Sequence, residues 1–458
     1  MLAELRLFLA KRKEYRRNAH LSPEQFREMQ LAKFRMLVRH AQANSPYYAR
    51  LIAQHDIRIA HCEPTDFPPL TKSELMANFD AIVTDSRLSK QQIVDFLSQS
   101  TNPADRYLDE FRVIHTSGSS GEVGYFVYSR MDWARAIAQM LRPRQRRPSP
   151  RTGSSVKRKP GRFRLAFYGA VGGHYAAVTM MSAMQHGLAR LFLKVGLFEV
   201  NSPLALTISQ LNAFQPDVLS GYTGALVMLA RKQQEGVLQI TPRAISTAGE
   251  GMSATDKAIL ETAFGCEAGN GYGSSEHLMM GLVNPETSSM LLMDDELIYE
   301  PAADHTLVTN LFNYTMPLIR YRMADILRPV AHKTNPASPY LEVESVVGRT
   351  ESMPFFTNEE GQLDGINPIT VVEIFVAGVQ RFQLQWLSST AFDFLVCLDP
   401  ALTPVQQAAA VRSVEQRLLE ILTGKLLRNV IFRVLPVADI PISPVTRKFQ
   451  LILDRRSD

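Results

Sequence analysis

Between residues 111 and 247, short apolar runs alternate with stretches of helical spacing, and this alternation limits most strongly the folds open to the chain. A short apolar run bounded by turn residues predicts a buried strand, and a helical stretch between two such runs predicts a crossover helix. The pattern is therefore typical of an α/β fold with a largely parallel or mixed sheet. The expected strands are residues 111–114, 164–168, 191–192, 218–219 and 244–247.

The segments on either side of this region predict different structures. Residues 1–100 are expected to be mostly helical, beginning with an amphipathic helix in residues 1–17 and a helix from residue 23 that stops near Pro46. Thr71 stands three positions before Glu74, which predicts a capped helix start. Strands at 296–299, 306–311 and 318–322 predict an antiparallel β subdomain.

The last hundred residues predict a second, smaller domain. Strands at 382–386, 392–398 and 430–434 accompany a helix at 404–422, which indicates an α+β fold. We therefore expect a large N-terminal domain at residues 1–347, with its helical first part at 1–100, and a small C-terminal domain at residues 348–458. A chain of 458 residues that is 45% hydrophobic is long enough for two such cores.

Cysteine usage and hydropathy exclude several classes of protein. Cys62, Cys266 and Cys397 lie far apart and form no C-x-x-C pair, which argues against a disulfide framework and against a zinc site. No segment approaches the roughly 20 uninterrupted apolar residues that cross a bilayer, so we expect no membrane span. The expected location is the reducing cytoplasm, and contact with a membrane surface stays open.

The formal net charge of +5 comes from one segment. Residues 142–164 contain ten Lys or Arg and no acid, so taking ten from +5 leaves −5 for the remainder. Pro, Ser and Gly in the same segment predict an exposed mobile loop. It is either a solvated variable loop or a contact for a phosphate-bearing partner. No nucleic-acid recognition motif accompanies the charge, so we expect no nucleic-acid partner.

A Ser/Thr/Gly-rich stretch follows the first predicted strand directly. Small residues expose backbone N–H groups that form an anion-binding nest, and the hydroxyl groups add donors for phosphate oxygens. The stretch lacks the Gly-Lys-Ser/Thr ending of a Walker loop, because Glu122 follows it. Taken alone, a flexible turn is the better interpretation. The residues concerned are Thr116, Ser117, Gly118, Ser119, Ser120 and Gly121.

Five further short motifs follow in a fixed order, and their series is more specific than any one of them. They are Thr247-Ala248-Gly249-Glu250-Gly251, Gly271-Tyr272-Gly273-Ser274-Ser275-Glu276, Ile319-Arg320-Tyr321-Arg322-Met323-Ala324-Asp325, Gly348-Arg349-Thr350-Glu351 and Ser443-Pro444-Val445-Thr446-Arg447-Lys448. With this series the chain resembles the adenylate-forming superfamily of acyl- and aryl-CoA ligases, carrier-loading adenylation domains and luciferases.

Segments near the N-terminus narrow the resemblance to one branch. Residues 33–41, the Ser-Pro-Tyr-Tyr at 45–48 and the Pro-Leu-Thr-Lys at 69–72 are similar to phenylacetate-CoA ligases and the related CapK-like proteins, and Asp217-Val218-Leu219 is similar too. The resemblance implies ATP-dependent activation of a small, aromatic carboxylic acid to an acyl-AMP with release of pyrophosphate. Transfer of the acyl group to a thiol follows, with coenzyme A as the expected acceptor. An acyl carrier protein and a homodimer are further candidate partners.

The resemblance also implies roles for the motif residues. Thr116 to Gly121 hold the β- and γ-phosphates, Tyr272 lies against adenine, Asp325 accepts hydrogen bonds from the ribose, and Glu276 is the acid associated with Mg²⁺. Lys448 is the mobile catalytic lysine, Arg349 stands beside the hinge, and the small C-terminal domain rotates between half-reactions. Residues assigned to the nucleotide site by motif alone are Gly249, Glu250, Gly251, Gly273, Ser274 and Ser275.

The acid site is expected in the glycine-rich segment after the strand at 164–168. Glycines let an aromatic acid approach the backbone, and aromatic side chains line the walls. The candidates are Tyr168, Gly172, Gly173, His174 and Tyr222. His174 is either a residue that orients the substrate carboxylate or a packed core histidine.

Three departures from the superfamily pattern keep other functions open. Glu122 and Val123 stand where a lysine or proline is common, Glu351 replaces the usual hinge aspartate, and residues 357–364 predict an extended hairpin. One alternative stops at the adenylate or passes it to a carrier protein or an amine. Another is a catalytically impaired protein that binds a nucleotide or an acyl group.

Overall fold

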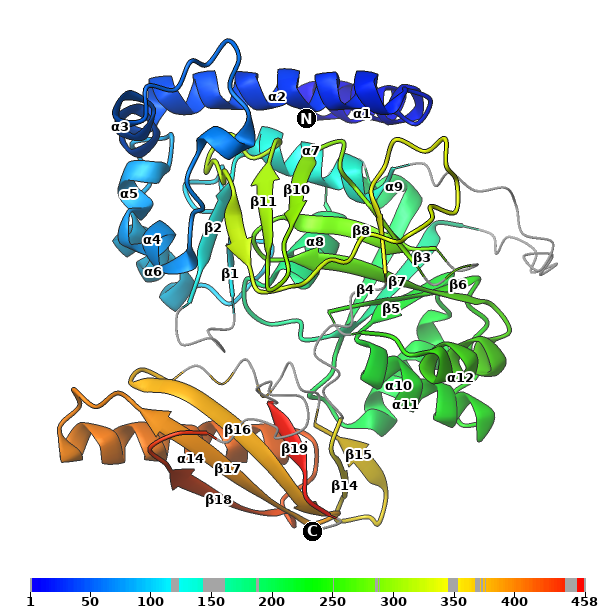
Figure 1. Ribbon diagram of the computed structural model, residues 1–458. Helices are drawn as coiled ribbons and strands as arrows, with labels where there is room; N and C mark the ends of the chain where they lie inside the picture. Colours follow the sequence, from blue (N-terminus) through cyan, green and yellow to red (C-terminus); the bar gives the residue numbers. More distant parts are fainter. Residues whose placement is uncertain are drawn as a thin grey trace.

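A computed structural model describes the chain at residues 2–116, 123–142, 161–186, 189–249, 251–284, 287, 289–344, 353–366, 371, 374, 376–440 and 451–456. Figure 1 shows a large N-terminal part, in which helices surround a sheet, and a smaller C-terminal part with its own sheet below it. The division agrees with the predicted α/β fold and its small second domain. The predicted boundary at residue 347 falls in a stretch outside the described residues.

An eight-stranded mixed sheet forms the centre of the N-terminal part, in the order β13-β9-β8-β7-β6-β5-β3-β4. Strands β4, β3, β5, β6 and β7 are parallel, and β8, β9 and β13 continue the sheet in antiparallel pairing. The bounds are β3 Phe163–Gly169, β4 Leu193–Glu199, β5 Val218–Gly221, β6 Ala244–Ala248, β7 Glu267–Ser274, β8 Leu278–Val283, β9 Met290–Leu292 and β13 Glu342–Val343.

The chain order of the parallel strands creates a switch point in the sheet. The connection from β3 leads to β4 on one side, and the chain then returns to place β5 on the other side of β3. In open α/β sheets, ligands bind outside the carboxyl ends of the strands where the direction of winding reverses. The carboxyl ends of β3 and β5 are therefore the first place to look for a site.

Crossover helices cover the sheet (Figure 1), and buried Leu and Ala side chains of α10 and α11 contribute to the core beneath them. The bounds are α7 Arg130–Met140, α8 Ala176–Ala183, α9 Ala189–Phe192, α10 Leu204–Phe214, α11 Thr223–Gln234 and α12 Ala254–Phe264. The strand predicted at 191–192 is wrong, because these residues end α9 and the strand begins at Leu193. An apolar run this short is compatible with a helix or a strand, and its sequence alone does not decide between them.

The first hundred residues are helical, as predicted. The bounds are α1 Leu2–Asn18, α2 Pro23–Asn44, α3 Pro46–Gln54, η1 Pro64–Asp66, α4 Lys72–Ala77, α5 Phe79–Ile82 and α6 Lys90–Gln99. The Thr71 hydroxyl accepts a hydrogen bond from the backbone N–H of Glu74 and so caps α4. Ser45 separates α2 from α3, and Pro46 occupies the first position of the new helix. Of the described helices, none is long and apolar enough to cross a membrane.

Two small sheets complete the N-terminal part. Strands β1 Arg112–His115 and β2 Tyr125–Tyr128 form an antiparallel hairpin, so the first predicted strand is real but does not join the large sheet. Strands β10 Leu297–Pro301, β11 Thr306–Asn310 and β12 Tyr321–Met323 form the predicted antiparallel subdomain. The third strand begins later than predicted because Arg320 has a φ of 50°, which interrupts extended backbone.

The C-terminal part has a separate hydrophobic core. Its sheet has the order β18-β17-β16-β19, and α14 Pro404–Gly424 packs against it. The strands are β16 Val379–Ser388, β17 Ala391–Leu398, β18 Ile431–Pro436 and β19 Ile452–Asp454, and a hairpin of β14 Phe355–Thr357 and β15 Leu363–Gly365 precedes them. The α+β prediction is confirmed, and so is the hairpin expected near residues 357–364.

Helix α1 is held on the N-terminal part by a buried network of charges. The Glu296 carboxylate lies 2.7 Å from Lys11 Nζ and 3.2 Å from Lys33 Nζ, and Glu14 pairs with Lys33 at 2.6 Å. Burial opposes the charged form of Glu296, but the two lysines outweigh it and lower its pKa from 4.5 to about 2. Arg142, the first residue of the basic segment, pairs with buried Asp295 and therefore belongs to this packed network.

We expect Glu296→Gln to lower the free energy of unfolding by about 3 kcal/mol at pH 7, because it leaves buried lysines without their carboxylate. The folded pKa lies below the unfolded value, so the contribution of Glu296 is present above about pH 4.5. The contribution is lost as the pH falls toward 2. Urea unfolding at a series of pH values should show the difference between variant and wild type shrinking across that window.

Glu420→Gln is the matched control, since Glu420 pairs with Arg417 on the exposed surface of α14. Its effect should stay within about 1 kcal/mol. Equal effects of the two variants would contradict a buried ionic attachment of α1.

Candidate active site

The carboxyl ends of the parallel strands bring four loops to one edge of the sheet. Tyr168 in β3 pairs with Phe198 in β4 and with Gly221 in β5, and Gly221 pairs with Thr247 in β6. These pairings place the glycine-rich segment after β3 beside the loops that follow β4, β5 and β6. The switch point predicted from topology and the acid site predicted from sequence therefore coincide.

The glycine-rich segment is tied down at both ends. Its first residues are held by Glu199, whose carboxylate accepts from the Val171 backbone N–H at 3.0 Å. At its far end, Gly173 has a φ of 77° and donates its N–H to Thr101 at 2.7 Å. A Cβ placed on Gly172 would meet no atom within 4 Å, so the segment is open at its centre.

His174 is packed against the helical first part. Its Nε2 lies 3.1 Å from the Ser100 hydroxyl, its ring contacts Phe96 edge-on, and the side chain is buried. Burial lowers the pKa of His174 to about 4, with a smaller contribution from His115, so the ring is neutral at pH 7. These contacts match the packed-histidine interpretation.

The two tyrosines expected at the acid site are also buried. Tyr168 is fully buried in β3, and burial raises its pKa, assisted by the charges of Asp364 and Glu199. The Tyr222 hydroxyl accepts from the Ala170 backbone N–H at 3.4 Å, and its ring packs against Phe167. Tyr222 thus supports the start of the glycine-rich segment, while Tyr168 belongs to the core behind it.

Thr116, the first residue of the phosphate-loop motif, is in contact with Lys72. Thr116 accepts from the Gly124 backbone N–H at its hydroxyl and donates its own N–H to the Gly124 carbonyl, both at 2.8 Å, which closes the base of the loop. Lys72 Nζ donates to the same Thr116 hydroxyl at 3.1 Å. A Cβ on Gly124 would lie 3.0 Å from Lys72 Cε, so a glycine at this position leaves room for the lysine side chain.

Backbone pairing brings the segment before Lys72 to the strand that leads to Asp325. Leu70 donates its N–H to the Arg320 carbonyl, and the Leu70 carbonyl accepts from the Arg322 N–H, which forms a short parallel bridge with Tyr321. The chain leaving that bridge reaches Asp325 four residues later. Residues more than 200 positions apart thus meet at one cluster.

The acidic side of this cluster is a pair of carboxyl groups. Tyr272 donates its hydroxyl to Asp325 Oδ2 at 2.9 Å, and the Tyr321 hydroxyl lies 3.4 Å from Glu276 Oε1. Burial raises the pKa of Glu276, and the Asp325 charge adds to this, while Lys72 opposes it. The cluster combines one ammonium group, two carboxyl groups and the hydroxyl groups of Thr116, Tyr272 and Tyr321.

Comparison with known proteins identifies the architecture around these residues. No family model matches the chain. Protein CapK of Staphylococcus aureus is 21% identical over 364 residues, which cover 75% of this chain and 72% of that protein. Indoleacetate–lysine synthetase of Pseudomonas savastanoi is 30% identical over 120 residues, which cover 25% of this chain and 30% of that protein.

A solved structure decides the fold. The crystal structure of 2-hydroxyisobutyryl-CoA ligase with 2-HIB-AMP and CoA, in the thioesterification state, aligns with a TM-score of 0.59 at 17% identity. The alignment covers 96% of this chain and 92% of that one. This chain has the adenylate-forming fold. The fold that the ordered motifs implied by resemblance is thereby confirmed.

Only part of the motif series of this adenylate-forming fold lies in described residues. Gly249 has a φ of 83° after β6, Gly251 follows it, and Ser274 accepts from the His277 backbone N–H in the turn after β7. Gly273 is required there, because a Cβ would lie 2.6 Å from the Leu278 carbonyl oxygen. Outside the described residues are Ser117, Gly118, Ser119, Ser120, Gly121, Glu122, Glu250, Arg349, Glu351 and Lys448.

Sequence reasoning gave no role to Lys72 or Glu199. Lys72 stands in a segment similar to the superfamily, and its position one residue inside a capped helix was the available signal. Glu199 ends β4, a strand that the sequence pattern placed too early. A carboxylate at the end of a parallel strand is a recognisable candidate once the strand is set in register.

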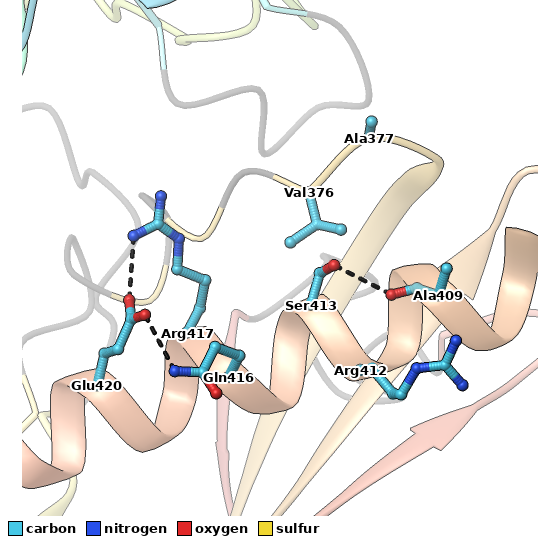
Figure 2. Close-up of a pocket in the computed structure, with 8 residues that line it drawn as sticks. All are labelled: Val376, Ala377, Ala409, Arg412, Ser413, Gln416, Arg417 and Glu420. Carbon is cyan, nitrogen blue, oxygen red and sulfur yellow. Dashed lines mark hydrogen bonds and ion pairs between the residues drawn. The ribbon is translucent and has the colours of Figure 1, made fainter.

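A separate pocket of about 570 Å³ lies on the C-terminal domain along α14. Figure 2 shows Arg412, Ser413, Gln416 and Arg417 on the exposed side of the helix, with Glu420 accepting from both Arg417 and Gln416. None of its lining residues comes from the strand edge or from the Lys72 cluster. We therefore assign the candidate active site to the strand edge and not to this surface pocket.

The close pairing of β3 with β5 leaves no room for a side chain at Gly221. A Cβ there would lie 2.2 Å from the Tyr168 carbonyl oxygen. We expect Gly221→Ala to lower the free energy of unfolding by about 1–3 kcal/mol, because the two strands must separate. Chemical denaturation of the purified variant measures this.

Gly269→Ala in β7 is the matched control, since a Cβ at Gly269 would meet no atom within 4 Å. It should change stability by less than about 1 kcal/mol. A Gly221→Ala protein as stable as the control would show that the strand ends do not meet as described.

Proposed function

We propose that this protein activates a small carboxylic acid with ATP, forming an acyl-AMP and releasing pyrophosphate. The observation that carries the proposal is that Lys72 donates to Thr116 and acts on the charge of Glu276. The residue before Thr116 is joined to the glycine-rich segment, because the His115 N–H donates to the His174 carbonyl at 3.1 Å. The adenylate-forming fold supports the same reaction class, because its solved relative is bound to the adenylate 2-HIB-AMP.

The chemistry of the first half-reaction matches the charges of the cluster. A carboxylate that attacks the α-phosphorus of ATP approaches a group that is already negative, so the site must neutralise charge on both. Lys72 supplies a fixed ammonium group at the base of the phosphate-loop motif.

The acidic residues fit a magnesium ion and a ribose. Mg²⁺ in nucleotide sites is commonly held by one or two carboxylates together with phosphate oxygens, and Glu276 beside the phosphate-loop motif provides such a donor. When bound, the ion would neutralise phosphate charge. Asp325 is a short acceptor with one oxygen already fixed by Tyr272, which suits hydrogen bonds from ribose hydroxyl groups.

The remaining roles rest on motif resemblance. Ser117 to Gly121 would bind the terminal phosphates, and Gly249, Glu250 and Gly251 would border the nucleotide with Gly273, Ser274 and Ser275. Lys448 would bridge the carboxylate and the α-phosphate, and Arg349 would stand at the hinge. For the acid, Gly172 and Gly173 lie where a compact planar substrate could approach the backbone, and Tyr222 supports their segment from behind.

For the second half-reaction we propose a thiol acceptor, with coenzyme A first. The ligase of the aligned structure is bound to CoA, which supports this acceptor. The domain arrangement of this chain is closer to the thioesterification state of that ligase, at a TM-score of 0.59, than to its postadenylation state, at 0.54. An amine is the second candidate, because the local similarity to indoleacetate–lysine synthetase concerns an enzyme named for joining an acid to lysine. A carrier-protein thiol is a third. The cytoplasm remains the proposed location, and a homodimer remains a proposal.

Acid-dependent release of pyrophosphate tests the proposal directly. The protein is incubated with ATP, Mg²⁺ and a panel of aryl and short aliphatic acids, and coenzyme A, lysine or a carrier protein is added in separate reactions. We expect at least one acid to release pyrophosphate, and one acceptor to receive its acyl group. No release with any member of a broad panel would count against the function.

Lys72→Met isolates the contribution of the lysine to nucleotide binding. Loss of a charged hydrogen bond to phosphate should weaken ATP binding by about tenfold to a hundredfold, measured by calorimetry. Lys232→Met is the control, because Lys232 pairs with Glu235 on the far helix α11. If ATP affinity stays the same in Lys72→Met, the phosphates do not lie beside Thr116.

Lys448→Ala separates an enzyme from a binding protein. The resemblance predicts that pyrophosphate release falls by orders of magnitude, roughly a hundredfold or more, as for loss of a group that stabilises the transition state. ATP affinity should change little. Unchanged release would remove Lys448 from the mechanism. A catalytically impaired binding protein would show no acid-dependent release in wild type or variant and would keep its ATP affinity in both.

A further inference from the structure

The C-terminal domain is attached to the N-terminal domain by a buried ion pair that belongs to none of the motifs. Lys425 follows the last residue of α14, and its Nζ lies 3.0 Å from Oδ1 of Asp364 in β15. The lysine side chain is fully shielded from solvent, and the aspartate side chain is 4% exposed. Two charges this well buried require further partners, and both find them on the N-terminal domain.

Asp364 caps a helix of the other domain. Its Oδ2 accepts from the backbone N–H of Leu204, the first residue of α10, at 3.3 Å. The N-cap residue of α10 is Pro203, which contributes no side-chain hydrogen bond. The carboxylate therefore satisfies one of the free N–H groups of α10 and lies at the positive end of the helix dipole.

Lys425 reaches the frame of the acid site. Its Nζ donates to the Val200 carbonyl at 2.9 Å, and the Val200 N–H donates to the Gly169 carbonyl at the same distance. Gly169 is the last residue of β3, where the glycine-rich segment begins. A Cβ on Gly424 would lie 3.4 Å from the Asn201 carbonyl oxygen, so α14 approaches this frame closely.

The hairpin that carries Asp364 is held on the C-terminal domain. Phe356 packs against Phe392 with ring centroids 5.5 Å apart, and Thr357 donates its N–H to the Ser389 carbonyl at 2.8 Å. Asn429, just after α14, donates to the Thr357 carbonyl at 2.8 Å. Asp364 and Lys425 therefore move together when the two domains change their arrangement.

We propose that Asp364 and Lys425 form a latch that holds the domains in the arrangement for acyl transfer and opens for adenylation. They are positioning residues, since neither belongs to the Lys72 cluster. The same segment also makes an apolar contact, because Met353 and Phe355 pack against the N-terminal core and Arg231 lies over the Phe355 ring. The ion pair suits a reversible contact, because both charges regain water when the domains separate. The proposal rests on the proposed function, from which it takes the two half-reactions.

The experiment compares the two half-reactions in the double variant Asp364→Asn/Lys425→Met. Removing both charges together avoids an unpaired buried charge, so the variant should fold. We expect acid-dependent ATP–pyrophosphate exchange to stay within about twofold of wild type. Acyl transfer to the acceptor should fall by about tenfold, a typical size for a coupling between sites.

Small-angle scattering of the full chain without ligands provides a readout independent of activity. The latch predicts a larger radius of gyration in the double variant than in wild type. Arg433→Met is the matched control, because Arg433 and Asp393 form an ion pair at 2.7 Å on the surface of the same domain, with the arginine 65% exposed. The control should change neither half-reaction nor the scattering.

The possible results separate the two proposals. If exchange and transfer fall in proportion while the radius of gyration stays the same, Asp364 and Lys425 are structural residues and the latch is wrong. If nothing changes, the latch is also wrong. If wild type shows no exchange with any acid, the proposed function fails, and the scattering comparison alone then decides whether the ion pair holds the domains together.

Discussion

The parallel register of β3 with its two neighbours is the constraint on which the described site depends. Because Tyr168 stands opposite both Phe198 and Gly221, the ends of three strands fall at one edge, and the loops that follow must meet there. A Cβ at Gly221 would clash with the Tyr168 carbonyl oxygen, so the paired strand ends are also closely packed. The glycine-rich segment, its Glu199 support and the cap of α10 all start from this edge.

A second backbone pairing, between Leu70 and Tyr321, brings charged side chains together. The short bridge between Leu70 and Tyr321 connects the helical first part to the antiparallel subdomain, and Lys72 acts on the charge of Glu276, as Asp325 does. Partial burial strengthens the interactions within this cluster, because there is less water to screen them. Burial also raises the pKa of Glu276, so the carboxylate gains from a nearby cation. A site with these properties is suited to polyphosphate chemistry.

Much of this fold follows from local sequence signals. Alternating apolar runs predicted the strands β3, β5 and β6 within two residues at each end, and Thr71 predicted the start of α4.

Features that depend on residues far apart in the sequence were predicted less well. The run at 191–192 was predicted as a strand, but it ends helix α9. The strand predicted at 111–114 forms, but it pairs in a hairpin with β2 and not with the large sheet. The apolar character of a run does not determine which strand it pairs with. Lys72, Asp364 and Lys425 gain their roles only from contacts across more than forty residues. Tyr168 and His174 were expected at the acid site from their neighbours in sequence, and the fold turns both side chains into packed positions.

A co-crystal structure with ATP, Mg²⁺ and a substrate acid tests the central claim most directly. The account predicts phosphate oxygens within hydrogen-bond distance of Lys72 and Thr116, ribose hydroxyl groups at Asp325, and the acid at the open segment around Gly172. A nucleotide bound elsewhere on the chain, with Lys72 and Asp325 free of contact to it, would contradict the account.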